Sequence, residues 1–166
     1  DVRTRIDVLS EIPREWRAAL MRWRRLQQPL RERMAAEGAP ADAPSGADLY
    51  LLCQTLVGTL PAEGLEGEAL ADYGERIVQY MHKAAREAKM RTAWTRPDAG
   101  YEDALRRFVA LTLDAAQPAA WWADLRAFAS RIALFGAWNS LSLTLLKFAS
   151  PGVPDVYQGT ELMPLT

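Results

Sequence analysis

The chain is poor in the two residues on which most metal sites and nucleophilic sites depend, with one cysteine and one histidine in 166 residues. Cys53 has no partner for an internal disulfide and lies in an apolar run, which predicts a buried thiol and fits a reducing cytoplasm. His82 has no second histidine or cysteine at a metal-ligand spacing, and no Gly-x-Ser-x-Gly turn accompanies it. We therefore expect neither a metal site nor a catalytic nucleophile in this chain.

The sequence also has almost no net charge and no phosphate-binding motif. Its 20 basic and 21 acidic residues give a net charge of −1, so no overall field favours nucleic acid or an anionic membrane. Neither a Gly-rich phosphate loop nor a dinucleotide fingerprint is present, and no cofactor is expected. The longest uncharged run, residues 132–146, is shorter than the roughly 20 residues of a membrane span, so we interpret it as a core helix.

Apolar residues make up 49% of the chain and recur at helical spacing along most of it. The pattern predicts an all-α fold, an irregular multi-helix bundle. Two local signals mark helix starts, because Ser45-Gly-Ala-Asp48 matches a capping box and Asp98 has the character of an N-cap. The predicted helices begin at Pro13, after Ser45, after Gly67, after Asp98 and at Pro118.

The C-terminal part departs from this pattern. From Trp138 to Phe148 the chain is apolar on nearly every side, which predicts a helix buried all round by neighbours beyond this bundle. Pro151 and Pro154 cannot continue a helix, so residues 151–161 are predicted to form one short strand that ends in a loop. A lone strand needs a partner for its ladder. Together with Asp1 in place of an initiator methionine, this predicts a piece of a larger protein, whose uncovered apolar surface favours self-association.

The turn that follows the helix ending near Lys89 has the composition of a sugar site. Thr92 and Trp94 lie in this turn with Arg91 and Arg96. An exposed indole ring can cover the C–H face of a pyranose while cations and hydroxyls bond the sugar hydroxyls. In the alternative interpretation, Trp94 fills the bundle and the cations interact with the helix C-terminus.

A second polar cluster, which includes Tyr157 and Gln158, follows the predicted strand. Barrel enzymes build their active sites at the C-terminal ends of strands, although local hydrogen bonding could also explain such a cluster. A third feature is the arginine-rich character of the helix that begins at Pro13. Interleaved glutamates favour a solvated face, but a non-enzymatic interaction module that uses this helix as its partner surface stays open as an alternative.

Several segments, in order along the chain, resemble a known family. Residues 151–161, with the sequence Pro-Gly-Val-Pro-Asp-Val-Tyr-Gln-Gly-Thr-Glu, look like the eighth barrel strand of the alpha-amylase superfamily. Together with five further segments they resemble the maltooligosyltrehalose synthase family over essentially the whole chain. These segments are residues 1–11, 83–89, 92–94, 139–141 and 145–147.

The resemblance implies a fold context and an activity. Residues 1–149 would be the helical region between the seventh and eighth strands of a (β/α)8 barrel, and residues 150–166 the eighth strand with its following loop; the other strands are absent. The implied enzyme is an isomerase of trehalose biosynthesis, an intramolecular glucosylmutase. It converts the reducing-end α-1,4 linkage of a maltooligosaccharide into an α,α-1,1 linkage by a retaining mechanism. The implied catalytic carboxylates precede this chain, so no catalytic residue is assigned here.

On the same resemblance, Lys89, Thr92 and Trp94 are expected to wall the reducing-end subsites of a helical active-site cover. Tyr157 and Gln158 are expected to line the barrel side. The expected partners are the maltooligosaccharide substrate and the remainder of the barrel, and the isolated chain is expected to be inactive. An amylase-type hydrolase with a similar helical insertion is a further alternative, which analysis of the products would separate from the mutase.

Overall fold

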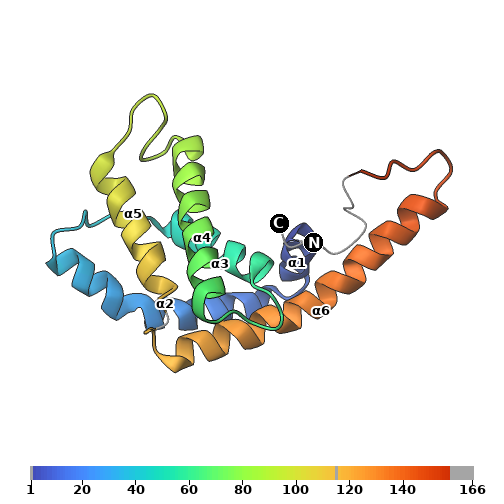
Figure 1. Ribbon diagram of the computed structural model, residues 1–166, viewed down its shortest axis with the longest axis horizontal. Helices are drawn as coiled ribbons and strands as arrows, with labels where there is room; N and C mark the ends of the chain where they lie inside the picture. The colour runs from blue at the N-terminus through green and yellow to red at the C-terminus, as the bar shows by residue number, and fades with distance from the viewer. Residues whose placement is uncertain (1, 115, 158–166) are drawn as a thin grey trace. The chain divides into compact units, whose positions relative to one another are not determined.

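The computed structural model describes residues 2–114 and 116–157, which form α-helices joined by turns and contain no strand (Figure 1). The all-α prediction is thus confirmed for these residues. The segment before Pro13 is helical too, although it was not among the predicted helices. The helices are α1 (Val2–Glu11), α2 (Pro13–Ala36), α3 (Gly46–Thr59), α4 (Gly67–Ala88), α5 (Ala99–Thr112) and α6 (Ala119–Ala149).

The chain divides into two compact units. The first unit comprises residues 1–19, 54–64 and 123–166, and the second comprises residues 20–53 and 65–122. The divisions fall inside α2, α3 and α6, so each of these helices contributes residues to both units.

In the second unit, α4 and α5 lie side by side (Figure 1). Apolar residues recur every three to four positions along α4, so Ile77 and Met81 share one buried face. Leu105 and Phe108 form the buried face of α5. The pairing of these two helices sets the geometry of the candidate site, which lies where α4 ends and α5 begins.

Both predicted caps are confirmed in this unit. The Ser45 N–H donates to Asp48 Oδ2 at 3.1 Å, and the Asp48 N–H donates to Ser45 Oγ at 3.2 Å, which is a reciprocal capping box. Asp98 Oδ1 accepts the N–H of Tyr101 at 3.0 Å and so caps α5. The Tyr101 hydroxyl also donates to Asp48, so the starts of α3 and α5 are tied together.

The first unit is held by side-chain hydrogen bonds and one close backbone approach around α1. Arg5 Nη1 donates to the carbonyl of Leu60 at 2.7 Å in a buried position. Asn139 Nδ2 donates to the carbonyl of Thr4 at 3.3 Å. A Cβ atom at Gly136 would lie only 2.6 Å from Arg5 Cγ and 3.0 Å from its Cα, so this position requires glycine.

Helix α6 is a single helix of 31 residues with two different halves. Leu125 and Ile132 in its first half are fully buried, whereas Trp138 is 63% exposed and Leu145 69% exposed. By length and composition α6 is apolar enough to cross a membrane, and only 17% of its apolar window is buried. The core helix predicted for residues 132–146 therefore lacks cover within the chain, because the described residues provide too few neighbours to surround it.

The predicted C-terminal strand is not shown by the structure. Residues 151–157 form bends and irregular backbone, and Val153 is 98% exposed. The rest of the predicted strand and loop, residues 158–161, lies outside the described residues. A strand is stabilised by hydrogen bonds to a neighbouring strand, and the described chain has no second strand to provide them.

Candidate functional site

The candidate site is built around a buried carboxylate that joins α4, α5 and the turn between them. Glu102 lies in the first turn of α5, where the helix dipole favours a negative charge, and its side chain is 9% exposed. His82 and Arg86 lie four residues apart on α4 and so face α5 together. With Thr92 and Trp94 from the turn, these residues form what we call the Glu102 cluster.

Four donors occupy the two oxygens of Glu102. Arg86 forms a fork, with Nε at 2.8 Å from Oε1 and Nη2 at 2.7 Å from Oε2. The Thr92 hydroxyl also donates to Oε1. His82 Nε2 lies 3.1 Å from Oε2. Because an ionised carboxylate can only accept, His82 Nε2 must carry the proton in this contact.

The cluster strongly favours the charged form of Glu102. The hydrogen bonds from Arg86 are the main reason that the pKa of Glu102 is lowered from 4.5 to about 2, against an opposing effect of burial; Thr92 and His82 add to the lowering. The same contact raises the pKa of Arg86. Glu102 is therefore an anion over the whole physiological pH range and is unsuited to act as a general acid.

Trp94 projects from a tight turn beside this cluster. The N–H and C=O groups of Ala93 and Arg96 exchange two hydrogen bonds of 3.1 Å, which leaves Trp94 and Thr95 as the two central residues of the turn. The Trp94 side chain is exposed, with 56% of the residue accessible. The Arg86 guanidinium carbon lies 4.8 Å from the centre of the indole ring, in cation–π geometry. Trp94 therefore does not fill the bundle.

The other predicted site residues have different environments. Lys89 is exposed and ends α4 in the left-handed conformation, with φ 57°. Thr92 is 1% exposed, and its hydroxyl also accepts the N–H of Asp98 at 3.0 Å. Tyr157 is 65% exposed. Gln158 lies outside the described residues. Lys89, Thr92 and Trp94 thus share one short stretch of the second unit, whereas Tyr157 belongs to the first unit.

Sequence reasoning did not find Glu102 or Arg86. Their separations along the chain, 10 residues from Glu102 to Thr92 and 16 to Arg86, match no local motif. The usable signal was indirect: Glu102 follows the N-cap of a predicted helix, and Arg86 lies four residues after the single histidine. Only the pairing of α4 with α5 brings these residues together.

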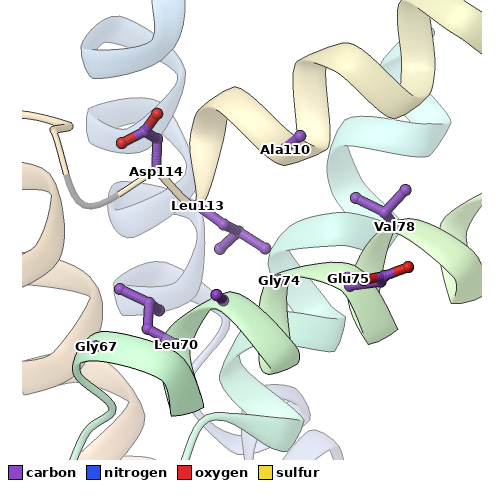
Figure 2. A pocket seen from close by; sticks show the side chains of 9 residues that line it. Gly67, Leu70, Gly74, Glu75, Val78, Ala110, Leu113 and Asp114 are labelled. Carbon is purple, nitrogen blue, oxygen red and sulfur yellow. The ribbon is translucent and has the colours of Figure 1, made fainter.

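A separate groove lies toward the other ends of α4 and α5 (Figure 2). It has a volume of about 480 Å³. Its lining has two carboxylates, and neither an aromatic ring nor a side-chain donor is among the residues that form it, so it lacks the usual elements of a sugar site. The residues that line the groove are Gly67, Leu70, Ala71, Gly74, Glu75, Val78, Ala110, Leu113 and Asp114.

The rare residues of the sequence offer little reactive chemistry. Cys53 is buried as predicted, and burial raises its pKa to about 12, so the thiolate is scarce at neutral pH. His82 is engaged with Glu102. Over residues 2–114 and 116–157, no three His, Cys, Asp or Glu side chains gather in a way that could hold a metal ion.

Comparison with known proteins relates the chain to proteins named maltooligosyl trehalose synthases. No family model matches it. The chain is 33% identical over 162 residues to a Mycobacterium tuberculosis (strain CDC 1551 / Oshkosh) protein named "Putative maltooligosyl trehalose synthase". This alignment covers 98% of the chain and 18% of the mycobacterial protein.

Solved structures show the same relationship. A crystal structure of a maltooligosyl trehalose synthase matches with a TM-score of 0.80 and 35% identity, over 99% of this chain and 20% of that one. A glycosyltrehalose synthase from DSM5389 matches with a TM-score of 0.76 and 37% identity, over 99% of this chain and 19% of that one. The resemblance predicted from the ordered motifs is confirmed, and the chain spans about a fifth of the length of these proteins.

Proposed function

We propose that this chain is the helical part of an intramolecular glucosylmutase that forms maltooligosyltrehalose from maltooligosaccharides. The supporting observation is the similarity to maltooligosyl trehalose synthases, which extends over 98% of the chain at 33% identity. In this proposal the enzyme is a cytoplasmic isomerase of the alpha-amylase type. Its catalytic carboxylates belong to other parts of the protein, so the isolated chain is inactive.

Residues 1–149 are proposed to form the helical region between the seventh and eighth barrel strands, and residues 150–166 to supply the eighth strand with its following loop. The second half of α6 supports a docking role, because its large apolar side chains are exposed in this chain. Contact with the remainder of the barrel would cover them. The exposed members of this apolar segment are Leu134, Phe135, Trp138, Leu141, Leu143, Leu145, Leu146 and Phe148.

The chemistry of a mutase explains the need for a helical cover. After cleavage, the released glucose must stay in place until its 1-OH attacks the glucosyl-enzyme, because water that enters first gives hydrolysis. A cover that holds the glucose and excludes water favours transfer. Trp94 suits this task, since it combines an exposed ring with a neighbouring cation.

The residues predicted for the site have three kinds of role in this proposal. Trp94 and Lys89 contact the sugar at the reducing-end subsites, and Tyr157 and Gln158 line the barrel side. Thr92 has an indirect role, because its buried hydroxyl stabilises the turn that carries Trp94.

The proposal is tested by incubating the full-length parent enzyme with maltohexaose while reducing ends and free glucose are followed together. Loss of reducing ends with little glucose is the expected result. A rise in reducing ends would identify a hydrolase, and no change in either would favour a non-enzymatic interaction module.

The role of Trp94 has its own test in the same assay. Trp94→Ala should raise the ratio of free glucose to mutase product, because the cover then holds glucose less firmly. Tyr80→Ala is the matched control, since Tyr80 is also a half-exposed aromatic residue of the second unit but lies outside the Glu102 cluster. An unchanged ratio for Trp94→Ala would contradict the cover role.

A further inference from the structure

We propose that Glu102 is a positioning residue that orients the Trp94 ring through Arg86 and Thr92, so that the ring is a preformed platform for the sugar at the reducing end. The identity of the ligand rests on the proposed function. The positioning itself rests on the contacts of the Glu102 cluster alone.

The Trp94 ring is more than half exposed and has a cation beside it. With 56% of the residue exposed, the side chain has little packing around it to select one orientation. The Arg86 guanidinium contacts the ring, with its carbon 4.8 Å from the ring centre. The orientation of Arg86 therefore influences the orientation of the ring.

Arg86 is itself held in one orientation by Glu102. Its fork uses both carboxylate oxygens, at 2.8 Å and 2.7 Å, and a planar guanidinium with two such bonds has little rotational freedom. Glu102 is buried and receives further bonds from His82 and Thr92. The carboxylate thus serves as the fixed point from which the cation is aimed at the ring.

Thr92 gives Glu102 a second connection to the same turn. Its hydroxyl donates to Glu102 and accepts the Asp98 N–H, so the backbone two residues before Trp94 is anchored on both sides. Glu102 therefore binds both Thr92, at the start of the turn, and the Arg86 guanidinium that lies against the ring. A ring that is ordered before the sugar arrives loses less conformational entropy on binding.

The inference is tested in the full-length enzyme with Glu102→Gln, Arg86→Met, Trp94→Ala and the two double variants that include Trp94→Ala. Glu102→Gln and Arg86→Met should each raise the ratio of free glucose to mutase product about threefold. Added to Trp94→Ala, neither should raise it further, because both act through the ring. Effects that simply multiply would overturn the inference.

Two further variants separate positioning from general stability. Arg86→Lys keeps the cation but not the fork, so its ratio should lie between those of the parent and Arg86→Met. Glu87→Gln removes a charge from the exposed Lys83–Glu87 pair of α4 and should leave the ratio unchanged. If Glu102→Gln does not fold, the Arg86 variants alone test the inference. An unaltered ratio of free glucose to mutase product in Arg86→Met would then overturn the positioning.

A readout without substrate distinguishes this inference from the proposed function. In enzyme labelled with 5-fluorotryptophan, the ¹⁹F resonance missing from Trp94→Phe identifies Trp94. Arg86→Met and Glu102→Gln should shift or broaden that resonance, and Glu87→Gln should not. A shift in an enzyme that shows no mutase activity would retain the positioning and remove the proposed function. An unmoved Trp94 resonance would overturn the positioning whatever the activity.

Discussion

The Glu102 cluster and the apolar segment of α6 differ in how far their characteristic side chains are buried within the chain. In the cluster, a buried carboxylate receives donors from His82, Arg86 and Thr92, so its charge is satisfied within the chain. Along the second half of α6, large apolar side chains such as Trp138 and Leu145 remain exposed. The first region satisfies its charge within the chain, and the second leaves apolar surface exposed. The comparison separates a cluster whose stability can be tested in the isolated chain from an apolar segment whose proposed docking can be tested only in the full-length protein.

The largest effect should come from charging the apolar segment of α6. The double change Leu141→Glu with Leu145→Glu should destabilise the full-length protein by about 3 kcal/mol or more, because docking would bury two unpaired charges. In the isolated chain the two positions are 53% and 69% exposed, so each change should cost no more than about 0.5 kcal/mol. Thermal unfolding of both forms measures the contrast.

Met21→Glu serves as the control for this experiment. Met21 is 50% exposed on α2, and a glutamate there would lie four residues before Arg25, a favourable helical pair. Equal melting temperatures for the α6 variant and the control in the full-length protein would mean that the apolar segment of α6 is not a docking surface.

An intermediate effect is expected when the Glu102 cluster loses its carboxylate. Glu102→Ala should lower the free energy of unfolding by about 2 kcal/mol, because the donors of Arg86 and Thr92 lose a charged acceptor. Urea unfolding of the chain measures this loss. A change below about 0.5 kcal/mol would show that water replaces the carboxylate and that the cluster is not self-sufficient.

The same carboxylate predicts a dependence on acid pH. Its pKa is about 2 in the folded chain and 4.5 ordinarily, so its stabilising contribution is complete above about pH 4.5 and is lost as the pH falls toward 2. The stability difference between the parent and Glu102→Gln should therefore shrink between pH 4.5 and pH 2. Urea unfolding at a series of pH values tests this, and a difference that stays constant with pH would contradict the lowered pKa.

The smallest effect is expected at the N-cap that supports the cluster. Asp98→Ala should cost about 1 kcal/mol, because the Tyr101 N–H loses its side-chain acceptor. Asp103→Ala, an exposed change one turn further along α5, should alter the free energy of unfolding by less than about 0.5 kcal/mol. Equal losses for both variants would mean that capping does not contribute to the start of α5.

The elements that could be predicted from sequence are those with local causes. The starts of α2, α3 and α5 were found from Pro13, the capping box at Ser45 and the cap at Asp98, since each signal acts over three or four residues. Trp94 was recognised as a candidate because it follows a helix end among cations. Helix α1 was missed, because its stabilisation comes from contacts such as Arg5 with Leu60 rather than from a local signal.

Local sequence signals therefore located most of the helices, and the ordered motifs indicated which family the chain resembles. The folded structure was needed to show that Glu102 connects Arg86, His82 and Thr92, because those residues meet through the packing of α4 against α5. It also decided that the second half of α6 is exposed and that no strand forms in residues 151–157. Burial and strand pairing depend on which neighbours are present, and neighbours are a property of the folded chain rather than of any short segment.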